Sequence, residues 1–175
     1  MGFFETIRYT LIKKEKNIEI RQYDVFLLAS TKTLSNKQFD SGFMNVFNYI
    51  SGDNHTSEKI SMTTPVVSYE EDDQLVTGFY VPSKYDKTNV PKPTSEHVFI
   101  QENEASIYAV IRFSGGWREK NFKVAEERLR DYLNQNHYEI MSNRIIFRYQ
   151  PPFIPGFLRR NEIAFKIKFT EQRGE

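Results

Sequence analysis

The chain has 175 residues, 39% of them hydrophobic and 15% aromatic, and its 24 basic and 23 acidic residues leave a net charge of +1. This length favours one domain with a sizeable core, and the balanced charge gives no electrostatic indication of a nucleic-acid partner. Because cysteine is absent, disulfides, thiolate catalysis and Cys-based metal sites are excluded.

Membrane segments and targeting signals are not indicated. No hydrophobic run approaches the roughly 18 residues of a transmembrane helix candidate, and the N-terminus lacks the apolar stretch of a signal peptide. We therefore expect a cytoplasmic protein without an integral membrane segment, and a monomer.

The first part of the chain predicts a strand, a helix and two strands. Residues 18–34 are rich in β-branched and aromatic side chains, which is typical of a long strand, here broken near Tyr23 and Asp24. Residues 38–50 carry apolar side chains at helical spacing. Two strands follow, at residues 59–69 with an interruption at Pro65, and at residues 75–81.

The same order recurs after a proline-containing linker at residues 83–96. The second series is listed in chain order: a broken long strand at 97–113, a helix at 118–134, and strands at 144–150 and 162–169. The recurrence predicts a duplicated chain.

We therefore predict an α+β fold of two β-α-β-β halves related by a pseudo-two-fold axis. About eight antiparallel strands would form one curved sheet or open barrel, flanked by two helices. The domain would span residues 18–170, with halves at about 18–82 and 97–170, an N-terminal segment at 1–17 and a tail at 171–175. A ligand would bind between helix and sheet, or between the halves.

Four stretches carry a resemblance to a known family: "IEIRQYD", "FNYISGDN" followed by "KISMTTPVVSY", "YAVIRFSGG", and "YQPPFIPGFLRRNEI". In this order and spacing the sequence resembles the SOUL/heme-binding protein family over roughly residues 18–169. The resemblance implies the same duplicated fold and a relation to the effector-binding domains of bacterial regulators, which bind varied hydrophobic ligands. It also implies a non-covalent tetrapyrrole held against the first helix near the proline-rich loop, without a dedicated axial ligand.

Carried onto this sequence, the helix positions that would face the tetrapyrrole are Asp40, Phe43 and Phe47. Phe43 and Phe47 are suited to stack on a porphyrin, whereas Asp40 has the wrong charge for an acidic propionate. In the loop, a basic position of the animal proteins falls near Ile154, which is apolar. These departures leave the identity of the ligand open.

Two methionines and two arginines complete the candidate ligand site. Met44 and Met62 are adaptable apolar contacts for a ligand, or ordinary core residues. Arg159 and Arg160 either bind a ligand carboxylate or hold the loop on the sheet through a pair with Glu162 or with a helix carboxylate. Because neighbouring strand residues point to opposite faces, we expect one of the two arginines to face a cleft.

Metal binding and catalysis find little support. His55, His97 and His137 show no metal-ligand spacing, so we expect exposed turn histidines and no metal ion. Nucleophile elbows, phosphate loops and HExxH motifs are absent. Glu102 and Glu104 are bases only if they are buried in the cleft.

We predict a non-enzymatic protein that sequesters or carries heme or another flat hydrophobic tetrapyrrole. One alternative is an effector-binding module for other hydrophobic small molecules, acting with an unidentified protein partner. A second alternative is a small-molecule hydrolase that uses a cleft glutamate.

Overall fold

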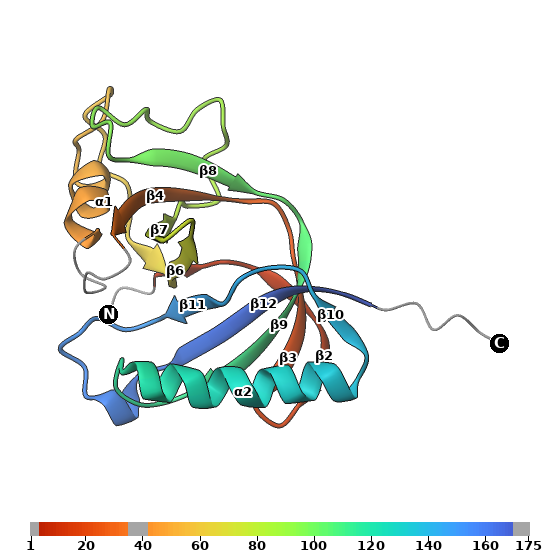
Figure 1. Cartoon of the computed structure of the whole chain (residues 1–175). Coiled ribbons are helices and arrows are strands. Elements are labelled where there is room, and N and C mark those ends of the chain that lie inside the picture. Colours follow the sequence, from red (N-terminus) through yellow and green to blue (C-terminus); the bar gives the residue numbers. More distant parts are fainter. Residues whose placement is uncertain (1–3, 35–41, 170–175) are drawn as a thin grey trace.

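The computed structural model of the protein describes residues 4–34 and 42–169 (Figure 1). The helical elements are α1 (Phe43–Ile50), α2 (Glu119–Gln135) and the short 3-10 turn η2 (Gly156–Leu158). The strands are β1 (Glu5–Thr6), β2 (Tyr9–Glu15), β3 (Ile18–Tyr23), β4 (Phe26–Leu34), β5 (Thr63–Thr64), β6 (Val66–Glu71), β7 (Gln74–Tyr80), β8 (Phe99–Asn103), β9 (Ser106–Phe113), β10 (Tyr138–Ile140), β11 (Ile145–Arg148) and β12 (Asn161–Phe169).

Ten of the described strands form one large sheet, and this confirms the predicted α+β class. Its order is β2-β3-β9-β12-β11-β6-β7-β4-β8, with β10 added beside β12, and all of these neighbours are antiparallel. β6 and β11, one from each half, pair at its centre. A parallel two-stranded pair, β1 with β5, stands apart from this sheet.

Two long strands are broken, as the sequence predicts, and the first break lies next to the predicted position near Tyr23 and Asp24. β3 and β4 are separated at Asp24 and Val25, and β8 and β9 at Glu104 and Ala105. In Figure 1, β4 and β8 lie in the upper layer, and the chain bends down on the right into β3 and β9 of the lower layer. β3 pairs with β9, and β4 with β8. Each half therefore places one strand in the layer of the other half.

The two helices cover different parts of the sheet (Figure 1). α2 packs on β9 and β12, and α1 on β4 and β7. The bounds of α2 agree with the predicted helix to within one residue. The described part of the first helix begins at Phe43, and predicted residues 38–41 lie outside the described residues. The predicted interruption at Pro65 is present between β5 and β6.

The sheet also includes strands that sequence reasoning did not identify. β2 pairs with β3 and lies within the segment that the sequence analysis set apart as N-terminal. Its Leu11 and Ile12 are both exposed, so the strand lacks the hydrophobic alternation that marks a half-buried strand. An edge strand such as this one is recognised by its partner rather than by its own pattern.

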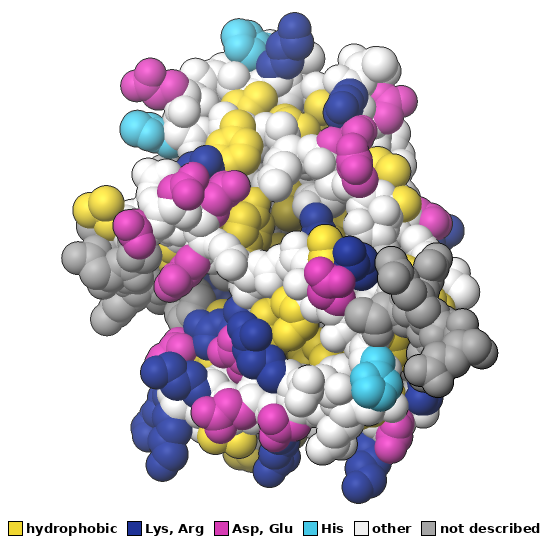
Figure 2. Space-filling view, turned by 45° about the vertical axis from the view of Figure 1, so that its right-hand side comes forward, with side chains coloured by type: hydrophobic (Ala, Val, Ile, Leu, Met, Phe, Trp, Pro, Cys, Tyr) yellow, Lys and Arg dark blue, Asp and Glu magenta, His cyan; other side chains and the backbone are white. Residues whose placement is uncertain are grey.

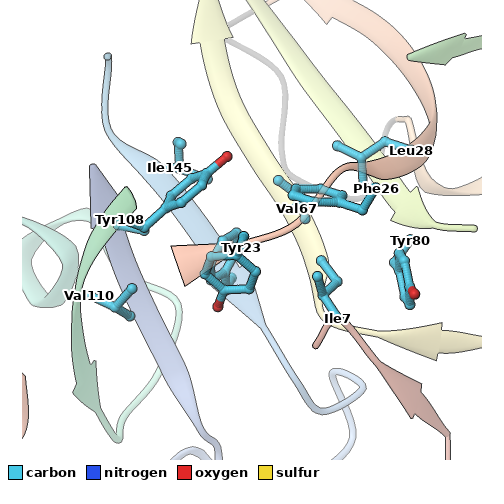
Figure 3. Packing of buried hydrophobic residues seen from close by; sticks show 11 residues of the cluster. Ile7, Tyr23, Phe26, Leu28, Val67, Tyr80, Tyr108, Val110 and Ile145 are labelled. Carbon is cyan, nitrogen blue, oxygen red and sulfur yellow. The ribbon is translucent and has the colours of Figure 1, made fainter. Parts of the chain in front are cut away.

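Three hydrophobic clusters form the core. One lies beneath α2 and one beneath α1. The third lies between the halves, where Tyr108 and Ile145 of the second half face Phe26 and Val67 of the first (Figure 3). Both halves share this third cluster, so neither half completes its core alone.

Candidate functional site

Helix α1 is anchored through one side. Val46, Tyr49 and Ile50 are buried against the sheet, and the Tyr49 hydroxyl donates a 2.6 Å hydrogen bond to the Pro91 carbonyl. The helix start approaches β4 closely at Gly42, where an added Cβ would lie 2.7 Å from a methyl group of Thr31. These contacts fix which face of α1 stays open.

The open flank of α1 is apolar, and we call Phe43, Met44 and Phe47 the α1 apolar face. The rings of Phe43 and Phe47 are stacked, with centroids 5.9 Å apart and planes 15° from parallel. Phe43 also leans on the buried Phe79, at 5.1 Å between centroids. Met44 is 54% exposed and Phe47 37% exposed. A preformed aromatic surface therefore meets solvent beside the core.

The other helix-side candidates differ in position. Met62 is partly buried and packs on the cluster beneath α1, as does Phe43. Asp40 lies outside the described residues. Met62 therefore belongs to the core beneath α1, on which the α1 apolar face rests through Phe43.

The proline-rich loop between β11 and β12 packs on the glycine turn that precedes α2. The Gly115 amide donates a 2.9 Å hydrogen bond to the Gly156 carbonyl. A Cβ at Gly156 would lie 2.9 Å from the amide nitrogen of Gly116, so only glycine fits there. The "SGG" turn therefore provides the backbone surface on which this loop packs.

Arg159 folds back on its own loop. Its Nε donates to the Ile154 carbonyl at 2.8 Å and its Nη2 to the Pro152 carbonyl at 2.6 Å. Its guanidinium lies 4.2 Å from the ring centroid of Trp117, and the Trp117 indole donates a 2.9 Å hydrogen bond to Asn161 Oδ1. Arg159 thus connects the loop to the glycine turn and to β12.

Arg160 belongs to a buried network around Glu162. Arg21 Nη2 donates to Glu162 Oε2 at 2.7 Å, and Arg160 Nη2 donates to the same oxygen at 3.1 Å. The Tyr149 hydroxyl donates to Oε1 at 2.6 Å. Burial alone would raise the pKa of Glu162, but the hydrogen bond and charge of Arg21, with the charge of Arg160, outweigh it and hold this pKa below its usual value. Glu162 is therefore an ionised anchor.

The predicted site residues fall in two places. Phe43, Met44, Phe47 and Met62 belong to the first half, whereas the loop with Ile154 packs on the second half. Ile154 is partly buried. Three other apolar side chains of the loop are exposed: Phe153, Phe157 and Leu158. The helix candidates and the loop therefore pack on different halves.

A cavity of about 240 Å³ lies between the halves, and sequence reasoning did not identify its lining. Its apolar lining residues are Phe26, Leu28, Val67, Ile145 and Phe147. Its polar lining residues are Tyr69, Glu70, Glu71, Gln101, Asn103, Tyr108, Ser142, Asn143 and Lys166. The signal in the sequence is the alternation along β9 and β12, which places Tyr108 and Lys166 opposite each other. That alternation does not say which face encloses a cavity.

The candidate metal and acid–base residues lie at the surface. His55, His97 and His137 are exposed, and so are Glu102 and Glu104. Glu102 pairs with Lys87 at 3.0 Å. Within residues 4–34 and 42–169, no group of three or more His, Cys, Asp or Glu side chains is placed to hold a metal ion. The buried cleft glutamate on which the hydrolase alternative depends is therefore not supplied by Glu102 or Glu104.

No helix in the described part of the chain is long and apolar enough to cross a membrane. On the face shown in Figure 2, acidic and basic side chains are interspersed, and hydrophobic side chains lie recessed between them.

Comparison with known proteins identifies relatives of this chain. The family described as SOUL heme-binding protein matches residues 4–166. Heme-binding protein 1 of Xenopus laevis is 30% identical over 158 residues, which cover 84% of this chain and 82% of that protein.

Solved structures share the fold at low sequence identity. The C-terminal domain of EcmrR has a TM-score of 0.64 and 11% identity, covering 93% of this chain and 99% of that chain. A hydrolase from Listeria innocua has a TM-score of 0.61 and 7% identity, covering 90% and 94%. At these identities the two structures bear on the fold alone.

Proposed function

The chain belongs to the SOUL heme-binding protein family, and from this membership we propose that it binds heme or a related tetrapyrrole non-covalently on the α1 apolar face. The observation that carries the proposal is the stacked and partly exposed pair of Phe43 and Phe47. A porphyrin is flat and apolar over most of its surface, so it would stack on these rings and cover Met44.

The size of the cavity between the halves supports a location of the ligand on the helix. The cavity between the halves measures about 240 Å³, which is below the roughly 300–1,000 Å³ of pockets that enclose drug-sized ligands. A porphyrin is too large to be enclosed there. An open surface beside α1 sets no such limit.

The role of the arginines toward a ligand stays a prediction. A ligand carboxylate would have to compete with the loop carbonyls for Arg159 and with Glu162 for Arg160. We therefore assign the binding free energy mainly to the α1 apolar face. The biological role that fits is sequestration or carriage without chemistry. A cytoplasmic location and a monomeric state also stay predictions.

The proposal is tested by titrating the purified protein with hemin and following the visible absorption. We expect saturable one-to-one binding, and an increase of about three- to tenfold in Kd for Phe47→Ala, since one aromatic stacking contact is lost. Phe43→Ala should act in the same direction, with some loss of stability because Phe43 also packs on Phe79.

Phe169→Ala is the matched control, because Phe169 is 50% exposed on β12, away from α1. A hemin response that does not saturate, or that is unchanged by both α1 substitutions, would contradict the proposal. In that case the effector-module alternative would take its place, and the cavity between the halves would be its site.

A further inference from the structure

We propose that the cavity between the halves is a second ligand site, specific for a small aromatic carboxylate. The inference does not depend on heme binding at α1. It rests on the size of the cavity, on its apolar walls, and on hydrogen-bond donors of three strands, β8, β9 and β12, that line it.

The walls favour a flat ligand of one or two rings. Phe26 and Leu28 of β4, Val67 of β6, and Ile145 and Phe147 of β11 line the cavity, and Val67 and Phe147 are neighbours in the β6–β11 register. Figure 3 shows Phe26 and Val67 on one side and Tyr108 and Ile145 on the other. A volume of about 240 Å³ is suited to a small aromatic molecule. Aromatic and aliphatic walls of this kind stabilise a ring by burial.

Asn103, at the end of β8, supplies a donor that has no protein partner. Its Nδ2 is buried and makes no hydrogen bond with any described residue. Buried amides in native proteins nearly always have a partner, so an unpaired one calls for an explanation. Asn103 lines the cavity, and rotation of its side chain would turn Nδ2 toward an acceptor oxygen on a ligand.

Lys166 and Tyr108 provide further donors from the second half. They are opposite each other in the β9–β12 register, and Lys166 Nζ lies 5.9 Å from the centre of the Tyr108 ring. Lys166 makes no ion pair with another residue of the described ranges. Burial raises the pKa of Tyr108 to about 12, so its hydroxyl keeps its proton near neutral pH. A cation with neutral donors beside it is complementary to a carboxylate.

Two acidic residues also line the cavity, and their negative charge opposes the binding of a carboxylate. Glu70 and Glu71 are exposed, and Glu71 pairs with Lys32 at 3.4 Å. Water screens exposed charges, whereas groups inside a cavity act at shorter range and in a lower dielectric. The inner donors should therefore decide the sign of the ligand.

The experiment compares two probes with the same indole ring and opposite charge. Indole-3-acetate and tryptamine are titrated into the full chain at pH 7 by isothermal titration calorimetry. We expect one-to-one binding of indole-3-acetate, and binding of tryptamine at least about tenfold weaker, because its ammonium meets donors instead of acceptors. Equal affinities, a preference for tryptamine, or no saturable binding of either probe would overturn the proposal.

Two lysine variants test whether indole-3-acetate binds in the cavity. Lys166→Met keeps the apolar stem and removes the charge, and it should weaken indole-3-acetate about tenfold. Lys168→Met is the matched control on the same strand, since Lys168 pairs with Glu139 and does not line the cavity. If Lys168→Met weakened binding as much as Lys166→Met, the assignment to the cavity would be wrong.

Asn103→Leu separates a binding role from a structural one. The substitution removes a buried unpaired amide, so the denaturation midpoint should stay the same or rise, while binding of indole-3-acetate weakens. A lower midpoint with unchanged binding would assign Asn103 to the fold instead.

The site is also distinguished from the one proposed on α1. Phe47→Ala should leave indole-3-acetate binding unchanged, and saturating indole-3-acetate should leave the hemin titration unchanged. Competition between hemin and indole-3-acetate would place them in one site and overturn the inference. Failure of hemin to bind at all would contradict only the proposal on α1.

Discussion

Among individual residues, Arg21 and Glu162 combine the strongest burial with the strongest charge interaction. The two side chains are 2% and 0% exposed and make two hydrogen bonds to each other, at 2.7 and 3.0 Å. Arg21 also donates to the Tyr23 hydroxyl at 2.9 Å. Breaking such a pair leaves a buried charge without compensation, so this network holds β3 onto the β12 layer.

Stability should therefore depend on the charge of Glu162. The pKa of Glu162 is lowered in the folded state from its usual value of 4.5. Its contribution is thus present above about pH 4.5 and is lost as the pH falls through the lower folded pKa. We expect Glu162→Gln to cost about 3 kcal/mol at pH 7, with a gap to the wild type that narrows below pH 4.5. Urea denaturation at pH 7, 5 and 3 measures the loss of stability at pH 7 and its decrease at lower pH.

The control is Glu119→Gln, because Glu119 pairs with Arg144 at the surface and is 54% exposed. It should cost under about 1 kcal/mol at pH 7. A gap for Glu162→Gln that stays constant from pH 7 to pH 3 would contradict the assigned ionisation.

Part of this network is visible in the sequence. A pair between an arginine and Glu162 is one of the two roles that the spacing allows, and Arg160 makes it. The partner Arg21 comes from a strand 141 positions earlier. A local pattern carries no information about that contact, because it exists only once β3 and β12 lie on either side of β9.

At the scale of elements, the proline-rich loop is fixed by close backbone approach more than by side-chain burial. Phe153 and Phe157 are 82% and 75% exposed. The loop is held instead by the contact of Gly156 with the glycine turn and by the hydrogen bonds of Arg159. Prolines reduce the conformational entropy that this loop loses on folding.

Gly156→Ala should displace the loop. The new Cβ would meet the Gly116 amide nitrogen and the Gly115 carbonyl carbon at 2.9 and 3.1 Å, and backbone atoms cannot move aside as a side chain can. We expect a loss of about 1–3 kcal/mol in the free energy of unfolding. We also expect a shifted fluorescence maximum of Trp117, the sole tryptophan, because its contact with Arg159 changes.

Gly116→Ala is the matched control in the same contact. No atom lies within 4 Å of the Cβ position at Gly116, so fluorescence and stability should stay close to the wild type. If the two variants behaved alike, the close approach at Gly156 would not be what holds the loop.

At the scale of the whole molecule, the halves are joined by exchange of strands. Ile20 of β3, from the first half, is buried in the cluster beneath α2. Ile100 of β8, from the second half, packs on the cluster beneath α1. The cluster between the halves contains residues of both halves (Figure 3). Each half therefore lacks core residues when the other is absent.

The chain should fold as one cooperative unit. We expect a fragment of residues 1–82 to show no cooperative thermal transition by circular dichroism, since it lacks the partner strands of β3, β4 and β6 from the second half. The full chain should show a single transition that is the same by circular dichroism and by Trp117 fluorescence. A fragment with its own sharp transition would show that the halves are independent domains.

Local patterns in the sequence predict the order of the main elements, the two breaks in the long strands, the α+β class and the family. These follow from local periodicity and from motifs that survive without three-dimensional context. The sequence also indicates Phe43 and Phe47 as candidate ligand contacts, which stays a prediction.

Which residues those elements enclose depends on how the strands pair in three dimensions. Three features join residues that are distant in the chain: the close approach at Gly156, the pair of Arg21 with Glu162, and the cavity with Asn103 and Lys166. The physical reason is that burial, close approach and charge compensation depend on distance in space. In a sheet built by strand exchange, that distance is set by the pairing of both halves.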